Sequence, residues 1–212
     1  MSNLVLLQAG AILASYLLGA VPFGLLLSRI ISKRDPREHG SGNIGATNAM
    51  RTGGKLVGAL TLLADIIKGV IPVALALAGQ WAEIWIAAIA LAAFLGHIFP
   101  VYLKFKGGKG VATMFGVMIP WSPWAAAIAF AVWLLALRLG RYVSLASILA
   151  GLSLPFAAWG LGSSAPCIGT CVVLALLMIL RHIGNIRRLL DGSEPSTLRD
   201  REEREALSEL RS

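Results

Sequence analysis

The chain has 212 residues, of which 57% are hydrophobic and only 14% charged, and its mean hydropathy is +0.75. Soluble domains are about half apolar and about 25% charged, so this composition excludes an ordinary soluble protein and indicates an all-α, polytopic integral membrane protein. The net charge of +8 is divided among several loops. That distribution predicts contact with anionic membrane lipids and argues against nucleic-acid binding, which needs one basic stripe.

Apolar runs long enough to cross a membrane fill most of the chain. A helix needs about 20 apolar residues to cross about 30 Å of hydrocarbon. The first run covers residues 4–31 and has no basic residue before it, so it predicts a retained helix instead of a cleaved signal peptide. Further spans are predicted at residues 56–78, 84–103, 142–161 and 165–180.

The segment 111–137 contains either one long helix or two helices that join at Pro120-Trp-Ser-Pro123. Basic residues collect in cytoplasmic loops, and two crossings place Lys109 and Arg138 on the same side of the membrane. We therefore predict seven transmembrane helices, with a short fourth helix of about 10 residues, or about 15 Å. This topology puts the N-terminus outside and the C-terminus in the cytoplasm. Residues 1–190 are predicted to form the transmembrane domain, and residues 191–212 a charged cytoplasmic tail.

Two features that suggest other classes of protein have plainer explanations. Gly40, Gly42 and Gly45 satisfy the letters of the dinucleotide pattern G-x-G-x-x-G, but a charged segment stands where such a site has a buried strand. Cys167 and Cys171 are one helical turn apart in an apolar run. This spacing is typical of small core residues and predicts neither a disulfide framework nor a metal site.

SGNIGATNAMR, residues 41–51, is the first of three polar segments that the predicted topology brings to the cytoplasmic surface. Hydroxyl and amide groups hydrogen-bond phosphate, and an arginine fork suits a phosphate or a carboxylate. Helix capping is the alternative explanation, but a single cap needs only one Ser, Thr or Asn. The candidate ligands in this segment are Ser41, Gly42, Asn43, Thr47, Asn48 and Arg51.

GHIFPVYLKFKGGKGVAT, residues 96–113, is the second polar segment. Glycines allow backbone conformations in which successive N–H groups turn inward and cradle an anion, and a helix that begins at about Val111 adds the positive end of its dipole. The loop is not a Walker A motif, because Gly110 stands where Ser or Thr must follow Lys109. A flexible basic loop at the lipid headgroups is the alternative. The candidate anion ligands are Lys106, Gly107, Gly108, Lys109 and Gly110.

RHIGNIRRLL, residues 181–190, is the third segment and places His182, Asn185 and Arg188 at intervals of three, on roughly one helix face. A basic helix end that complements the helix dipole is the alternative. Ionisable residues also occur inside the second predicted span, where Asp65 and Lys68 are spaced i, i+3. Because such groups are expensive within a membrane, they predict either a buried ion pair or a direct contact with substrate.

The sequence GSGNIGATNAMR, followed by DIIKG, GHIFPVYLKFKGGKGVAT, RYVSLAS and RHIGNIRRLL, resembles the bacterial acyl-phosphate:glycerol-3-phosphate acyltransferases, the PlsY family. The resemblance covers about residues 5–194. It implies a multi-pass enzyme of the bacterial inner membrane with seven helices and a cytoplasmic active site. It also implies transfer of a fatty acyl group from acyl phosphate to the 1-hydroxyl of sn-glycerol 3-phosphate, giving lysophosphatidic acid and inorganic phosphate, without acyl-CoA, acyl carrier protein or a cofactor.

By motif position, the resemblance assigns Ser41, Arg51, Lys109, His182 and Asn185 to substrate binding and catalysis. Acyl phosphate is already activated, so no enzyme nucleophile is needed, and the chain lacks a G-x-S-x-G nucleophile elbow. Catalysis then rests on positioning and electrostatics. Either His182 or a substrate phosphate oxygen takes the proton of the hydroxyl, and the sequence leaves both open.

Two other classes of protein share some of these features. An organic-phosphate transporter would also have apolar helices and phosphate-binding loops, and Asp65 and Lys68 favour it. Transporter sites, however, lie near the membrane midplane between repeated halves, and no repeat is visible here. A non-catalytic lipid-binding scaffold would not need three spaced polar motifs. The sequence indicates neither the acyl-chain preference nor the oligomeric state.

Overall fold

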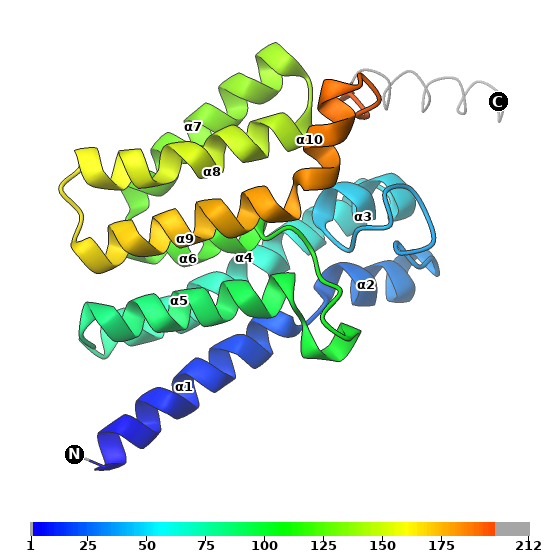
Figure 1. Ribbon diagram of the computed structural model, residues 1–212. Helices are drawn as coiled ribbons and strands as arrows, with labels where there is room; N and C mark the ends of the chain where they lie inside the picture. Colours follow the sequence, from blue (N-terminus) through cyan, green and yellow to red (C-terminus); the bar gives the residue numbers. More distant parts are fainter. Residues whose placement is uncertain (1, 198–212) are drawn as a thin grey trace, which may run out of the picture.

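The computed structural model describes residues 2–197, and this part of the chain consists of helices and connecting turns (Figure 1). In chain order the helices are α1 Ser2–Ala20, α2 Phe23–Leu27, the π-helical turn η1 Ser28–Ser32, α3 Ala46–Gly53, α4 Lys55–Ala78, α5 Glu83–Ile98, the 3-10 turn η2 Val101–Leu103, α6 Val111–Trp121, α7 Pro123–Gly140, α8 Val143–Gly160, α9 Ala165–Arg181 and α10 Ile183–Leu190.

Two of the predicted helices end earlier than the sequence indicates. The helix expected over residues 4–31 is interrupted after Ala20, because Pro22 has no N–H to donate and disfavours the helical conformation of Val21 before it. The helix expected to reach residue 103 stops at Ile98, and Pro100 and the short turn η2 follow. The other predicted spans agree with α4, α8 and α9 to within one residue at each end.

Five helical stretches among the described residues are long and apolar enough to cross a membrane. A sixth is counted if α9 and α10, which are bent by 59° relative to each other, form one broken span. The segment 111–137 is divided at Ser122, as predicted, into α6 and α7. At 11 residues, α6 rises about 16 Å, which is about half of the hydrocarbon thickness. The chain is therefore an all-helical integral membrane protein with five or six candidate spans.

Helix α5 lies in the middle of the bundle and packs against α1, α4 and α9 (Figure 1). Within an 18-residue window of the span Glu83–Leu103, 61% of the residues are buried, whereas only 17% are buried in α7, which is itself 18 residues long. Helices α4 and α6 pack closely against each other, and Gly69 of α4 faces Gly116 of α6 at their contact. Small residues at such contacts let helix backbones approach closely without a hydrophobic driving force from water.

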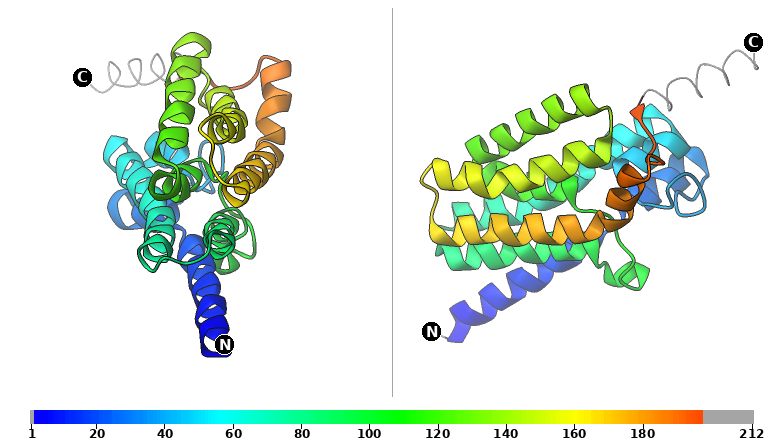
Figure 2. Two further views of the ribbon diagram at one scale, coloured as in Figure 1. Left: turned by 90° about the vertical axis from the view of Figure 1, so that its left-hand side faces the viewer. Right: turned by 45° about the horizontal axis from the view of Figure 1, so that its top comes forward.

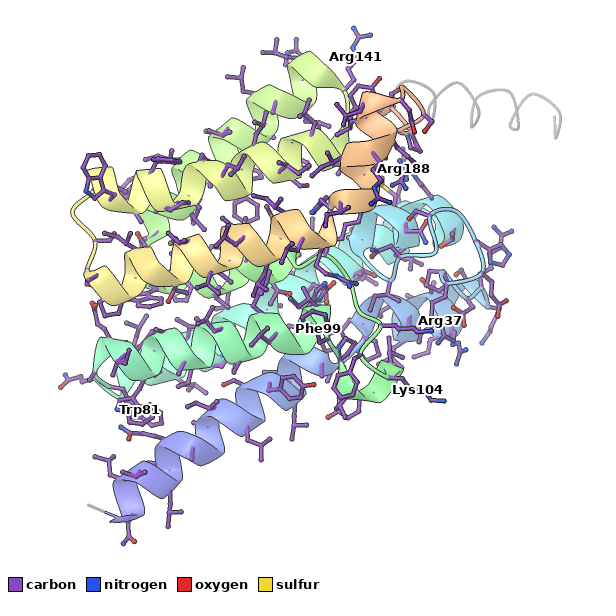
Figure 3. The ribbon with its side chains drawn as sticks, in the orientation of Figure 1. Arg37, Trp81, Phe99, Lys104, Arg141 and Arg188 are labelled. Carbon is purple, nitrogen blue, oxygen red and sulfur yellow. The ribbon has the colours of Figure 1, made fainter. Side chains whose placement is uncertain are left out.

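The polar segments gather at one end of the bundle. Helices α3 and α10 and the loop before α6 lie there, whereas the α8–α9 turn and the N-terminus lie at the opposite end (Figures 1 and 2). Figure 3 shows Arg37, Lys104, Arg141 and Arg188 at the polar end and Trp81 at the other. The fold thus brings segments that are far apart in the sequence to one surface.

Candidate active site

Asn48 organises the first polar segment from the inside. This side chain is only 2% exposed, and its Oδ1 accepts a hydrogen bond from the backbone N–H of Ser41 at 2.9 Å. Its Nδ2 donates to the carbonyl oxygens of Pro36 at 2.7 Å and of Asn43 at 2.8 Å. The amide of Asn48 thereby holds the loop so that Ser41 and Gly42 are exposed at its surface.

The other candidates of this segment lie along α3 or just before it. Asn43 turns its Oδ1 to the backbone N–H of Gly45 at 2.8 Å, so its side chain also shapes the loop. Thr47 is half-buried in the first turn of α3, and Arg51 is half-buried near the end of that helix. Sequence reasoning treated Asn43 and Asn48 as ligands, but their amide groups bond to the loop backbone in this structure.

The glycine loop, residues 104–110, lies flat against the end of α5. Gly108 donates its N–H to the carbonyl oxygen of His97 at 3.1 Å. A Cβ atom at Gly108 would collide with the His97 imidazole, and one at Gly110 would collide with the Phe94 ring. Gly110 also has a φ of +87°, which L-residues with a side chain rarely adopt. Glycine is therefore required at both positions, and Lys109 stands between them, half-buried.

The third segment is bent at His182, between α9 and α10. His182 is 1% exposed, and its Nδ1 is 2.8 Å from the carbonyl oxygen of Met178. A carbonyl only accepts hydrogen bonds, so Nδ1 carries the proton and Nε2 is the nitrogen available to a ligand. Burial, only partly opposed by the bond to Met178, lowers the pKa of His182 to about 4. The ring is therefore neutral at pH 7.

Glu194 joins the third segment to the chain that follows it. Its Oε1 accepts a hydrogen bond from Asn185 Nδ2 at 2.6 Å, and its Oε2 accepts one from Arg188 Nε at 2.8 Å. Burial disfavours the charged carboxylate, but the nearby polar side chains of Ser144, Asn185 and Arg188 outweigh burial and hold the pKa of Glu194 below its usual range. The domain boundary predicted at residue 190 thus assigns to the tail a residue that bonds to the site. The tail beyond residue 197 lies outside the described residues.

Lys109 is the point at which the segments converge. Burial lowers the pKa of Lys109 to about 8, against the opposing charge of Glu194 and with the help of the positive charges of Arg188, Arg51 and Arg181. These four partners come from α3, from the end of α9, and from α10 and the turn after it. Lys109, in the second polar segment, is therefore influenced by charges of the first and third segments, an arrangement that attracts an anion such as phosphate.

The affinity for inorganic phosphate is expected to fall by up to about tenfold per pH unit above pH 8. Lys109 is cationic below its pKa of about 8 and neutral above it, so its attraction for phosphate is present at pH 7 and lost as the pH rises. A calorimetric titration between about pH 7 and pH 9.5 measures this. In Lys109→Arg the guanidinium stays charged, and the break near pH 8 should vanish. A break that persists in this variant would assign the titration to another group.

Asp65 and Lys68 form an ion pair behind the glycine loop. Lys68 Nζ lies 2.7 Å from Asp65 Oδ1, and the two side chains are 2% and 3% exposed, respectively. Lys68 also donates to the carbonyl oxygen of Val21 at 3.0 Å, at the bend of the first span. His97 Nδ1 lies 3.7 Å from Asp65 Oδ1. The ion pair therefore lies next to His97, whose backbone carbonyl oxygen accepts the N–H of Gly108.

Arg181 is a second site residue that sequence reasoning missed. It is half-buried at the end of α9, and it donates to the carbonyl oxygens of Gly107 at 2.7 Å and Gly108 at 3.1 Å. Lys106 is exposed. No group of three or more His, Cys, Asp or Glu side chains suited to a metal occurs among residues 2–197.

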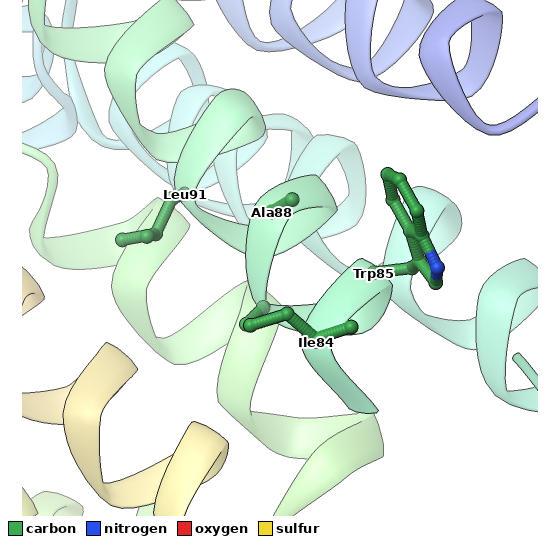
Figure 4. Close-up of a pocket in the computed structure, with 5 residues that line it drawn as sticks. Ile84, Trp85, Ala88 and Leu91 are labelled. Carbon is green, nitrogen blue, oxygen red and sulfur yellow. The ribbon is translucent and has the colours of Figure 1, made fainter. Parts of the chain in front are cut away.

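Two hollows on the molecule are apolar and lie on the helix flanks. One sits on α5 and is lined by Ile84, Trp85, Ala88 and Leu91, with Ala87 (Figure 4). The other, of about 450 Å³, lies between α8 and α9 and extends from Trp159 to Ile179. Neither of these two hollows is lined by a candidate site residue.

Comparison with known proteins identifies the family. A family model described as "Glycerol-3-phosphate acyltransferase" matches residues 9–192. Proteins described by the same words share 47% identity over 184 residues in Syntrophotalea carbinolica and 49% over 183 residues in Geotalea daltonii, in each case 86% of this chain and 94% of the relative. A crystal structure of PlsY (YgiH), an integral membrane glycerol 3-phosphate acyltransferase in its glycerol 3-phosphate form, is 39% identical with a TM-score of 0.86, over 89% of this chain and 94% of that one.

Fold and site together define an integral membrane protein with a basic, polar surface at one end of its helical bundle. The extent of these matches makes the assignment more specific. The chain belongs to the glycerol-3-phosphate acyltransferase family and is an integral membrane enzyme. This membership decides against the transporter and the non-catalytic scaffold considered from the sequence.

Proposed function

We propose that the enzyme transfers a fatty acyl group from acyl phosphate to the 1-hydroxyl of sn-glycerol 3-phosphate and releases lysophosphatidic acid and inorganic phosphate. The observation that carries the proposal is that the three polar segments lie at one end of the bundle (Figure 1), where the charges of Arg188, Arg51 and Arg181 act on Lys109, because both substrates bear a phosphate. The related crystal structures are described as the glycerol 3-phosphate form and the lysophosphatidic acid form of their enzyme, which supports the same acceptor and product here.

Each polar segment has a separate role in this proposal. The glycine loop, with Gly107, Gly108, Lys109 and Gly110, holds the acyl phosphate and stabilises the departing phosphate. Arg51, His182 and Asn185 hold glycerol 3-phosphate with its hydroxyl aimed at the acyl carbon. Ser41 donates a hydrogen bond to a phosphate or to the developing oxyanion. The outer ligands are Gly42, Thr47, Lys106 and Arg188. Asn43 and Asn48 act indirectly, because their side-chain amides hold the loop that carries Ser41 and Gly42.

The chemical step needs no covalent enzyme intermediate. The hydroxyl oxygen of the acceptor attacks the acyl carbon, the ester bond forms, and the bond from the acyl carbon to the phosphate oxygen breaks. Phosphate leaves with the bonding electron pair, and the hydroxyl proton passes to a base. No cofactor takes part in this step.

The substrate phosphate is the better base of the two considered. His182, with its pKa of about 4, holds a proton weakly, whereas a phosphate monoester has a second pKa of about 6. We therefore assign proton uptake to a phosphate oxygen. His182 Nε2 accepts a hydrogen bond from the acceptor and orients it.

The proposal also covers the acyl chain of the donor and the orientation of the enzyme in the membrane. The apolar groove between α8 and α9 ends at Ile179, three residues before His182, which supports an acyl chain lying along it. The gathering of basic residues at the polar end (Figure 3) supports a cytoplasmic active site under the positive-inside rule. We propose seven crossings of the bacterial inner membrane, with α6 as the short fourth, the N-terminus outside and the C-terminus inside.

The choice of donor is tested with purified enzyme in detergent and labelled glycerol 3-phosphate. Palmitoyl phosphate is expected to give labelled lysophosphatidic acid, and palmitoyl-CoA and palmitoyl acyl carrier protein are expected to give none above the blank. Enzyme with Lys109→Ala is the negative control. Product from palmitoyl-CoA at a rate equal to that from palmitoyl phosphate would contradict the proposed donor.

A further inference from the structure

Arg181 holds two successive carbonyl groups of the glycine loop. Its Nη2 donates to the Gly107 oxygen at 2.7 Å, and its Nε donates to the Gly108 oxygen at 3.1 Å. The guanidinium carbon also lies 5.6 Å from the centre of the Phe99 ring, over its face. A planar fork of donors that stacks on an aromatic ring has little freedom, so Arg181 fixes both peptide groups.

These two bonds determine how the loop faces its surroundings. In a trans peptide the C=O of one residue and the N–H of the next point in opposite directions. Because the Gly107 C=O points to Arg181, the Gly108 N–H points to α5, where it meets the His97 carbonyl oxygen at 3.1 Å. The loop is therefore clamped between α9 on one side and α5 on the other.

The two hydrogen bonds from Arg181 matter because the first two residues of the glycine loop have an unfavourable backbone conformation. Lys104 and Phe105 have φ values of +51° and +63°, in the left-handed region that residues with a Cβ atom rarely occupy. A loop under such strain relaxes unless tertiary contacts hold it. Arg181 provides two of those contacts in the middle of the glycine run.

Arg181 also connects the glycine loop to the third polar segment. It is covalently joined to His182, and it bonds to Gly108, the neighbour of Lys109. We propose that Arg181 is a positioning residue for acyl transfer, which sets the loop carrying Lys109 against the helix end carrying His182 and does not itself touch substrate. This inference rests on the proposed roles of Lys109 and His182.

The test compares Arg181→Gln and Arg181→Lys with Arg187→Gln, an exposed arginine of the neighbouring helix α10. A misplacement of about 1 Å between reacting groups costs about 100-fold in rate. We expect kcat to fall by about this factor in Arg181→Gln, while KM for each substrate changes by less than about threefold. Arg181→Lys should be intermediate, because one ammonium group replaces the planar fork. Arg187→Gln should keep the wild-type kcat.

A purely structural role is separated by chemical rescue. In Arg181→Ala, millimolar guanidinium is expected to restore part of kcat, because the ion can occupy the place of the lost side chain beside the two carbonyl groups. Alanine is chosen because it is the residue that best preserves the end of helix α9. Wild-type kcat in Arg181→Gln would overturn the proposal. So would a raised KM for one substrate with unchanged kcat, which indicates direct contact, or a loss of thermal stability in both Arg181→Lys and Arg181→Ala without rescue. A wrong assignment of the site itself is detected by a separate measurement. In that case Lys109→Ala would retain the wild-type kcat.

Discussion

Replacing Lys109 by alanine is expected to lower kcat/KM for the acyl donor by about 10² to 10³-fold, the cost of removing one donor aimed at developing charge. Lys109 is half-buried, and the positive charges of Arg188, Arg51 and Arg181 act on its ammonium and help to lower its pKa. The departing phosphate develops negative charge close to the Lys109 ammonium. A water molecule in place of the ammonium would stabilise this charge less, because it carries no net charge.

The matched control for this prediction is Lys104→Ala. Lys104 is exposed in the same loop (Figure 3), and its replacement by alanine removes the same charge as Lys109→Ala. Initial rates with palmitoyl phosphate, measured in detergent, should differ from wild type by less than about twofold in this variant. If Lys104→Ala and Lys109→Ala lose activity equally, the loop acts through general charge, and Lys109 does not have the specific role proposed here.

Replacing Asp65 by asparagine is expected to destabilise the fold by about 3 to 5 kcal/mol, because it leaves the Lys68 ammonium buried without its counter-charge. Lys68 Nζ lies 2.7 Å from Asp65 Oδ1, and the neutral carbonyl of Val21 is a poor substitute. For a chain of about this size, 1 kcal/mol shifts Tm by about 2 to 4 °C. Thermal unfolding in detergent should therefore show Tm lowered by roughly 6 to 20 °C.

The double substitution Asp65→Leu with Lys68→Met tests the cause of that loss. It removes both charges and keeps similar volumes, and replacing a buried pair by apolar residues is often neutral. We expect the double variant to recover most of the Tm lost in Asp65→Asn. If Asp65→Asn melts within about 2 °C of the wild type, the ion pair does not stabilise the fold.

Much of the fold follows from local sequence and charge position. The sequence predicts a break within Pro120-Trp-Ser-Pro123, because the positive-inside rule favours Lys109 and Arg138 on one side of the membrane, and the structure divides α6 from α7 at Ser122. The spans over α4, α8 and α9 follow from their apolar runs. The early stop after Ala20 was not predicted, although Pro22 was the available signal, because the apolar run continues through it.

The site was predictable where glycine and charge occur in ordered motifs, and not where a contact is tertiary. Arg181 reads in the sequence as a cation that complements a helix end, and only folding places it on Gly107 and Gly108. Glu194 reads as part of a charged tail, yet it binds Asn185 and Arg188. No sequence spacing relates such pairs, since their distance is determined by how α9 and α10 meet the loop.

The side chain of Asn48 shows a third kind of difference. Its residue type suits phosphate binding, but its amide is consumed by the backbone of residues 36–43. A polar residue in a glycine-rich loop serves the loop's own unpaired backbone groups as readily as it serves a ligand. Residue type alone does not separate the two uses.

The most direct test of one composite site is a double-mutant cycle between Lys109 and Asn185. Wild type, Lys109→Ala, Asn185→Ala and the double variant are compared by kcat/KM with palmitoyl phosphate and glycerol 3-phosphate. Residues that act on one transition state are strongly non-additive, so we predict that the double variant is little worse than the more impaired single variant. If the two losses multiply, Lys109 and Asn185 act independently, and the convergence of the polar segments into one site is contradicted.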